Sequence, residues 1–320
     1  MKNILLLFVF YIIRIEAYAQ TNYYNTTDIE IEVKGGKLYG TLSVPAGIKK
    51  PPVVLLIAGS GPTDRDGNNP IIPGKNNSLL QIADSLAKHG IACLRYDKRG
   101  IAKSVFKNMI EDSINFSDGV NDAIAFYQYL SNKKFKRIYI AGHSEGSLVG
   151  MSVAKQVQCS GFISLAGAGR RIDIILKEQL NSLPDNLKEE SYTYLDSLAA
   201  GKKIINPDKL LYSLFRPSIQ PYMISWLQYD PQQIIQSLNC PALIIQGNKD
   251  LQVKVLDAEN LKKANTKADL LIINNMNHVL KEVISNEPLD NQKTYGNPLL
   301  PVMHELISGM VNFIKQKKKH

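Results

Sequence analysis

Cysteine and tryptophan are scarce in this sequence. It contains 3 cysteines and 1 tryptophan among 320 residues, which is too few cysteines for a disulfide framework. Cys93, Cys159 and Cys240 each lie beside an apolar stretch, as small buried residues do. One pair could bridge in an oxidising compartment, but the sequence does not say which. No group of cysteines and histidines has the spacing of metal ligands, so we expect neither a metal nor a cofactor.

Internal repeats and nucleic-acid motifs are also lacking, which excludes solenoid and repeat architectures. The formal net charge is +9, but part of the excess is terminal, at Lys315, Lys317, Lys318 and Lys319. A solvated helix end accounts for such a cluster, and weak attraction to anionic surfaces is the alternative. We therefore predict no nucleic-acid partner and no specific membrane partner.

Residues 1–19 have the pattern of a signal peptide. Lys2 supplies a positive charge, and the apolar run 4–13 is too short to span a bilayer. Ala17-Tyr18-Ala19 fits the small-residue cleavage pattern. An uncleaved N-terminal anchor is the alternative. We expect a secreted or periplasmic protein whose mature chain begins at Gln20.

Short apolar runs alternate with segments of helical periodicity along most of the chain. Residues 52–58 are apolar nearly throughout, as a strand buried on both faces requires. The alternation predicts an α/β protein with a mostly parallel central sheet and helices on both faces. The expected strands are 28–33, 38–44, 52–58, 91–96, 137–141, 162–166, 242–246 and 270–273. The expected helices are 79–88, 117–130 (opened by a cap at Ser117), 145–157, 253–263 and 299–315.

The alternation of strands and helices stops in the middle of the chain. Residues 169–240 have helical periodicity interrupted by prolines, and no strong strand pattern. The sheet pattern then resumes at residue 242. We interpret 169–240 as a helical cap inserted into one α/β core domain, which comprises 20–168 and 241–320.

One motif between a predicted strand and a predicted helix points to nucleophilic chemistry. Gly142-His143-Ser144-Glu145-Gly146 matches G-x-S-x-G in the strand–turn–helix context that this motif requires. A sharp turn there lifts the serine into a cleft, and side chains at the flanking glycines would clash. We predict that Ser144 is a nucleophile. An ordinary turn is the alternative.

A serine hydroxyl needs a base, and in this chain order the acid comes next and the histidine last. Asp250 follows the strand 242–246, and His278 follows the strand 270–273. Both therefore lie at the same sheet edge as Ser144, where active sites of α/β proteins form. We predict that Asp250 is the acid and His278 the base, with Asp173 in the insertion as the alternative acid.

Acyl transfer also needs hydrogen-bond donors for the developing oxyanion. The backbone N–H of Glu145, directly after the nucleophile, is one expected donor. The loop Gly59 to Gly67, which reads GSGPTDRDG, follows the strand 52–58, and its glycines let the backbone approach a substrate. We expect the Ser60 N–H to be the second donor. Asp64, Arg65 and Asp66 are expected to form a local ion-pair network that holds this loop rigid, and direct contact with a substrate is the alternative.

These motifs together resemble one family. The chain is similar to the bacterial α/β-hydrolase esterases that combine a GSGPxDRDG loop with a GHSEG elbow. The matching residues are Gly59 to Gly67, Asp97-Lys98-Arg99-Gly100, Gly142 to Gly146, Gly247-Asn248-Lys249-Asp250 with Gln252-Val253, and Asn277-His278. The resemblance implies an α/β-hydrolase fold, a helical cap and carboxylic-ester hydrolysis. Serine aminopeptidases are more distant relatives.

We therefore expect a serine hydrolase that cleaves esters of small to medium acyl chains through an acyl-enzyme. A peptidase or amidase acting on short peptides is the alternative enzyme. A binding protein that kept the fold and lost the chemistry is the alternative outside enzymes, and the complete set of Ser144, Asp250 and His278 argues against it.

The export signal gives the first testable prediction. Expressed in a bacterium with its own leader, the chain should leave the cytoplasm and begin at Gln20, because residues 1–19 combine a charged start, an apolar core and a small-residue cut site. Intact-mass measurement locates the N-terminus. Replacing both Ala17 and Ala19 by Leu is the matched control and should block cleavage. A cytoplasmic protein that retains Met1 would contradict the prediction.

Overall fold

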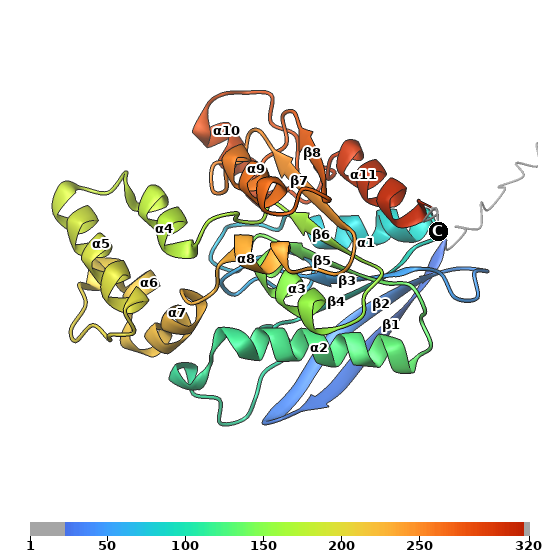
Figure 1. Cartoon of the computed structure of the whole chain (residues 1–320), viewed down its shortest axis with the longest axis horizontal. Helices are drawn as coiled ribbons and strands as arrows, with labels where there is room; N and C mark the ends of the chain where they lie inside the picture. The colour runs from blue at the N-terminus through green and yellow to red at the C-terminus, as the bar shows by residue number, and fades with distance from the viewer. Residues whose placement is uncertain (1–22, 317–320) are drawn as a thin grey trace, which may run out of the picture.

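The computed structural model describes residues 23–316, so the expected signal peptide and Lys317, Lys318 and Lys319 lie outside the described residues. Its centre is an 8-stranded sheet in the order β1-β2-β4-β3-β5-β6-β7-β8 (Figure 1). The strands are β1 (Tyr24–Val33), β2 (Gly36–Pro45), β3 (Val53–Ile57), β4 (Ala92–Tyr96), β5 (Ile138–His143), β6 (Gly161–Leu165), β7 (Ala242–Gly247) and β8 (Asp269–Ile273).

The sheet is parallel except at one edge. β1 and β2 form the expected antiparallel hairpin, and β2 pairs antiparallel with β4. Every later neighbour pair, from β3·β4 to β7·β8, is parallel. Parallel strands end at a common edge, so the segments that follow β3, β5, β7 and β8 gather there. The predicted mostly parallel sheet is confirmed.

Helices cover both faces of this sheet. The main ones are α1 (Ser78–Lys88), α2 (Phe116–Asn132), α3 (Glu145–Gln156), α9 (Val255–Ala264), α10 (Pro288–Lys293) and α11 (His304–Lys315). The burial of β3 on both faces explains why its sequence is a continuous apolar run. Leu55 and Ile57 pack in one core cluster with α2 and α3, whereas Val54 and Leu56 pack in a second cluster with α1 and α11. Successive side chains of a strand point to opposite faces, so burial on both faces leaves no polar position.

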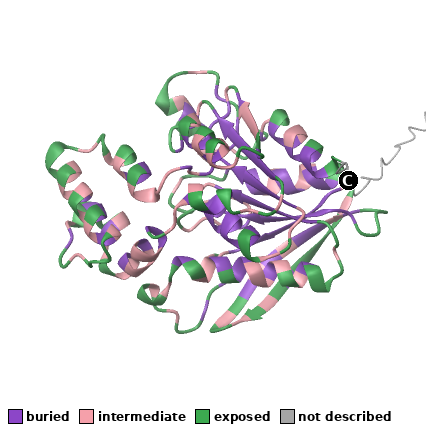
Figure 2. Ribbon diagram, viewed as in Figure 1, coloured by how far each residue is buried: buried purple, intermediate pink, exposed green. Residues whose placement is uncertain are grey.

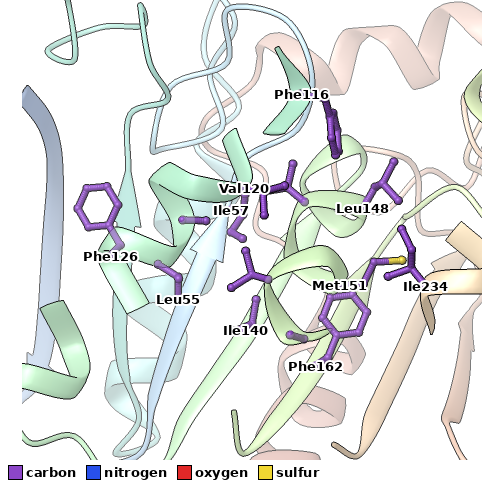
Figure 3. Packing of buried hydrophobic residues seen from close by; sticks show 14 of the residues in the cluster. Leu55, Ile57, Phe116, Val120, Phe126, Ile140, Leu148, Met151, Phe162 and Ile234 are labelled. Carbon is purple, nitrogen blue, oxygen red and sulfur yellow. The ribbon is translucent and has the colours of Figure 1, made fainter. Parts of the chain in front are cut away.

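Buried side chains from three elements meet beneath α3. Figure 3 shows Ile57 and Ile140 from the strands facing Val120 of α2 and Leu148 and Met151 of α3. Fully buried side chains of this size each contribute roughly 1.5–3 kcal/mol. Figure 2 shows the central strands buried and the outer turns of the helices exposed. This packing holds the start of α3, and with it the end of β5, in a fixed position.

Residues 169–240 contain helices, with no strand among these described residues. The helices are α4 (Ile172–Leu180), α5 (Asp185–Ala199), α6 (Tyr212–Phe215), α7 (Gln220–Trp226) and α8 (Pro231–Gln236), with short 3-10 turns at Lys209–Leu211 and Pro217–Ile219. Figure 1 shows α4 to α7 grouped at the left, beyond the strands. Phe116 of α2 packs against Trp226 and Tyr229, with ring centroids 6.2 and 4.5 Å away. The limits of the cap as a domain stay a prediction.

Two expected helix starts are wrong. The second helix begins after Asn115 rather than at a cap on Ser117, and the Asn115 N–H donates to Asp118 at 2.8 Å. The last helix begins at His304 rather than at residue 299. Val302 is held extended instead, because it forms a β-bridge with Lys281 and its N–H donates to Gln81. In the part of the chain that the structure describes, no helix is both long enough and apolar enough to cross a membrane.

Candidate functional site

The turn from β5 into α3 holds Ser144 in an unusual backbone conformation. Its φ is 55° and its ψ is −122°, a strained combination for a residue with a side chain. A Cβ on Gly142 would lie 1.9 Å from the Gly146 carbonyl oxygen. A Cβ on Gly146 would lie 2.5 Å from the carbonyl oxygens of Ile57 and Ala58 in and after β3. The expected elbow is present, and only glycine fits at both flanking positions.

The loop after β3 lies directly beside the elbow. A Cβ on Gly59 would lie 3.1 Å from the Ser144 Cβ, so the two backbones are in contact here. Ser60 follows and is exposed. Glu145 opens α3, where the first backbone N–H groups have no acceptor within the helix. Ser60 therefore follows a residue that lies close to the Ser144 side chain, and Glu145 follows Ser144 directly in the chain.

Asp250 and His278 form a buried hydrogen-bonded pair. The distance from His278 Nδ1 to Asp250 Oδ2 is 2.8 Å. The same carboxylate accepts from the Gln246 side chain at 3.0 Å and from the N–H groups of Gln252 and Val253 at 2.8 and 2.9 Å. Burial alone would raise the Asp250 pKa, but the His278 charge and these hydrogen bonds outweigh burial and hold it below its ordinary value. Asp250 is thus a carboxylate that orients His278.

His143 supports His278 from behind. Its Nε2–H donates to the His278 carbonyl oxygen at 2.7 Å, and the two ring centroids are 4.9 Å apart. Burial, followed by repulsion from the His278 charge, lowers the pKa of His143 to about 4. His143 is therefore neutral near pH 7 and acts as a hydrogen-bond donor. Sequence reasoning placed it in the elbow without a role.

Lys98 fastens the loop after β3. Its Nζ donates to the Gly59 carbonyl oxygen and, at 2.8 Å, to that of Gly61. Burial lowers the pKa of Lys98, and the nearby Glu145 charge opposes this. No cis peptide bond occurs in the described residues, so the Gly59–Ser60 peptide is trans. In a trans peptide the N–H points opposite to the C=O. With the Gly59 carbonyl turned to Lys98, the Ser60 N–H faces the other way.

The Glu145 side chain is bound to the helical insertion. The Tyr222 hydroxyl of α7 donates to Glu145 Oε1 at 2.5 Å. Burial first, and then the Glu145 charge, raises the pKa of Tyr222, so the hydroxyl keeps its proton. Glu145, the acid nearest to Ser144 in the chain, therefore already accepts a hydrogen bond from the insertion. Its charge also interacts with that of Lys98.

Lys281 anchors the segment that carries His278. The side chain has 0% exposure and no carboxylate partner. Its Nζ instead donates to the carbonyl oxygens of Asn76, Asn297 and Leu300, each at 2.7 Å. Asn277 adds a second tie, because its side-chain oxygen accepts from the Lys281 N–H at 3.0 Å. The His278 segment is thus joined to the end of the loop after β3 and to the chain before α11.

The charged residues of the GSGPTDRDG loop bind outside the loop as well as within it. The Arg65 guanidinium and backbone N–H both donate to Asp97, which follows β4, at 2.6 and 2.9 Å. Asp66 pairs with Arg95 on β4, whereas Asp64 accepts from backbone N–H groups of its own loop. The expectation of purely local ion pairs is therefore corrected. Two of the three charges tie the loop to β4.

The structure brings together Ser144, Asp250, His278 and the Ser60 loop at the carboxyl edge of the sheet. It does not bring Asp173 to His278, since Asp173 pairs with Arg171.

Residues that sequence reasoning missed are His143, Lys98, Lys281, Gln246 and Tyr222. Only His143 and Lys98 lie within quoted motifs and could have been singled out. Among residues 23–316, no group of three or more His, Cys, Asp or Glu is placed to hold a metal ion.

A surface depression elsewhere does not belong to this site. It is lined by Ser152, Gln156, Tyr229, Ile234 and neighbouring polar residues. Ser152 and Gln156 lie near the end of α3, whereas Ser144 precedes its start. The depression is therefore at the far end of that helix from the reactive side chains.

Known proteins resemble this chain in sequence and in structure. The family model described as serine aminopeptidase, S33 matches residues 75–282, a span that includes Ser144, Asp250 and His278. The esterase EstD of Thermotoga maritima is 29% identical over 260 residues, covering 78% of this chain and 59% of EstD. This chain thus spans less than two thirds of that relative's length.

Solved structures share the fold. Est1E from Butyrivibrio proteoclasticus matches with a TM-score of 0.55 at 18% identity, covering 84% of this chain and 96% of Est1E. A proline iminopeptidase from Mycobacterium smegmatis matches with a TM-score of 0.56 at 10% identity, covering 90% and 97%. At such identities the likeness concerns the fold alone, and it confirms the expected α/β-hydrolase fold.

Proposed function

Because this chain belongs to the serine aminopeptidase S33 family, we propose that it is a serine hydrolase that cleaves carboxylic esters of small to medium acyl chains. The observation that carries the proposal is the buried hydrogen bond between Asp250 and His278. This pair lies at the same edge of the sheet as the turn that holds Ser144. The similarity to EstD, whose name is that of an esterase, supports the choice of ester.

The proposed reaction follows from the roles of these three side chains. His278 takes the proton of Ser144 as the hydroxyl attacks the ester carbonyl, and Asp250 stabilises the imidazolium that forms. His278 then returns the proton to the departing alcohol. Water activated by His278 hydrolyses the acyl-enzyme and frees Ser144. The lowered pKa of Asp250 supports this assignment, because an ionised carboxylate is what stabilises an imidazolium.

Two backbone N–H groups are proposed to bind the oxyanion. The Glu145 N–H has the added favourable field of the α3 N-terminus. The Ser60 N–H is oriented by Lys98, which holds the Gly59 carbonyl on the opposite side of the same peptide. Lys98 is accordingly proposed as a positioning residue. No cofactor takes part in this scheme, and the proposed partner is a small-molecule ester.

The disposition of acids supports an ester rather than a peptide substrate. An aminopeptidase must bind an ammonium group, which calls for available carboxylates. Glu145 is occupied by Tyr222. In the insertion, four acids pair with basic side chains: Asp173, Glu178, Asp185 and Asp196. Asp208 and Asp230 each accept from the backbone N–H of the residue two positions later. Glu190 accepts from a tyrosine hydroxyl. Glu189 carries the remaining acid of residues 169–240.

We propose further that the protein is exported, with cleavage after Ala19. The support is the pattern of residues 1–19 alone. A secreted or periplasmic enzyme of this kind would meet esters outside the cytoplasm. The acyl length and the alcohol of the substrate are left open by this reasoning.

Replacing Ser144 by Ala should reduce ester turnover on the order of 10³-fold or more, because the nucleophile is lost while the oxyanion donors remain. The kcat/KM on a p-nitrophenyl ester and labelling by a fluorophosphonate probe measure the effect. Ser152→Ala, in the helix that follows Ser144, is the matched control and should keep both turnover and labelling. A folded Ser144→Ala protein with near wild-type turnover would refute the assignment.

Replacing Lys98 by Met should lower kcat at least about tenfold and leave KM within about twofold, because an oxyanion donor acts mainly on the transition state. Lys98→Arg should restore part of the lost kcat, since a guanidinium can still donate to the Gly59 carbonyl. Lys103→Met tests an exposed lysine of the neighbouring loop and should behave as wild type. An unchanged kcat in a folded Lys98→Met protein would show that Lys98 does not position the donor.

p-Nitrophenyl esters of short acyl chains should be turned over at least about a hundredfold faster than the matching aminoacyl anilides, a gap of roughly 2.7 kcal/mol in transition-state stabilisation. The physical reason is that Glu145 and seven of the eight acids of the insertion already bind other groups, combined with the poorer leaving group of an amide. Comparable kcat/KM on both series, or a preference for a free α-amine, would favour the aminopeptidase alternative. Glu145 and Glu189 would then be the acids to replace.

A further inference from the structure

Two cysteines lie next to each other at the edge of the sheet opposite the candidate site. β6 and β7 are parallel neighbours, with Phe162 paired to Ala242 in the register. The Phe162 N–H donates to the Pro241 carbonyl at 2.9 Å, so the strands begin side by side. Cys159 precedes Gly161 by two residues, and Cys240 precedes Ala242 by two. The sheet register therefore places both cysteines at its amino edge.

The sulfur atoms are already close to bonding distance. The Cys159 Sγ–H donates to the Cys240 Sγ at 3.3 Å. A disulfide needs a distance of about 2.05 Å, so the sulfur atoms must approach by roughly 1.3 Å. Both residues are partly exposed and lie in loops just before their strands, so part of each side chain faces solvent. Cys93 has 0% exposure in the middle of the sheet and is excluded as a partner.

We propose that Cys159 and Cys240 form a disulfide when the folded chain meets a disulfide-bearing oxidant, as proteins outside the cytoplasm do. The two cysteines are separated by 81 positions, and residues 169–239 all lie between them. The bond would close a covalent loop around the whole helical insertion and fix its exit to the sheet beside the start of β6. It lies at the opposite sheet edge from Ser144, so it leaves the chemistry untouched.

The oxidant takes up the electrons and protons that the two cysteines lose. The thiolate of one cysteine attacks the disulfide of the oxidant, and one thiol of the oxidant leaves. The second cysteine then attacks the mixed disulfide and expels the other thiol. Two S–H bonds are lost, one S–S bond forms, and the oxidant takes up two electrons and two protons. The hydrogen bond to Cys240, followed by burial, raises the pKa of Cys159, so its thiolate is scarce and the first attack is slow.

The long stretch of chain between the two cysteines makes the effect of the disulfide on stability measurable. A crosslink stabilises a protein mainly by restricting the unfolded chain, and the restriction grows with the length of the closed loop. We expect the oxidised protein to melt roughly 5 °C or more above the reduced protein. In a reducing cytosol the pair would remain a dithiol, and this contribution would be absent.

The test uses the purified full chain, so it does not depend on export or on esterase activity. The folded protein is incubated with oxidised glutathione, then denatured, alkylated and weighed. Alkylation of a single thiol is expected, with peptide mapping that joins Cys159 to Cys240. Addition of dithiothreitol should lower the Tm of wild type and of Cys93→Ser, but not that of Cys159→Ser or Cys240→Ser. Ester turnover by these variants should match wild type within about twofold.

Several results would overturn the proposal. Three alkylated thiols after oxidation, glutathione adducts without a crosslink, or a bridge through Cys93 would each show that the pair does not close. A crosslink without any change in Tm would show that it does not constrain the insertion. The Cys93→Ser control retains both reacting thiols. If either Cys159→Ser or Cys240→Ser fails to fold, the other can still be compared with this control.

Discussion

The close contact between the elbow and the end of β3 is the constraint on which the candidate site depends. Gly146 lies so near the carbonyl oxygens of Ile57 and Ala58 that a Cβ would be 2.5 Å from both, and Gly142 is equally crowded by the Gly146 carbonyl. This contact forces the turn that gives Ser144 a φ of 55°. It also brings the loop after β3 against the nucleophile. The core beneath α3 holds both segments in place.

Backbone carbonyl groups, more than carboxylates, set the positions of the loops around Ser144. Lys98 binds two carbonyls of the loop after β3, Lys281 binds three carbonyls from two further segments, and His143 binds the carbonyl of His278. A buried ammonium needs several strong acceptors to offset its desolvation. Lys98 and Lys281 are thus bound by carbonyl oxygens, whereas Asp250 binds the imidazole of His278.

The insertion contacts the core near the site through the Tyr222–Glu145 hydrogen bond and through an aromatic cluster. Tyr222 binds the Glu145 carboxylate, and Phe116 of the core packs against Trp226 and Tyr229. Glu145 therefore links α7 to the first turn of α3. Because its backbone N–H lies in that same turn, the seating of the insertion and the position of a proposed oxyanion donor are mechanically connected.

Particular segments show how far the sequence could be interpreted. β3 was recognisable because burial on both faces demands an unbroken apolar run, and the elbow because its glycines answer a local steric demand. The start of α11 was missed because the bridge of Val302 to Lys281 overrides the local helical pattern. The partners of Arg65 and Asp66 were missed because Arg95 lies on β4 and Asp97 directly after it, rather than in the loop.

The sequence by itself determined the order of strands and helices, the elbow, and the identity of Ser144, Asp250 and His278 as candidates, because motif spacing and periodicity are local properties of the chain. Only the tertiary structure decided which distant residues meet. Tyr222 and Glu145 are 77 positions apart, and Cys159 and Cys240 are 81 apart. Contacts at such separations are set by strand order and helix packing, so no local pattern in the sequence records them.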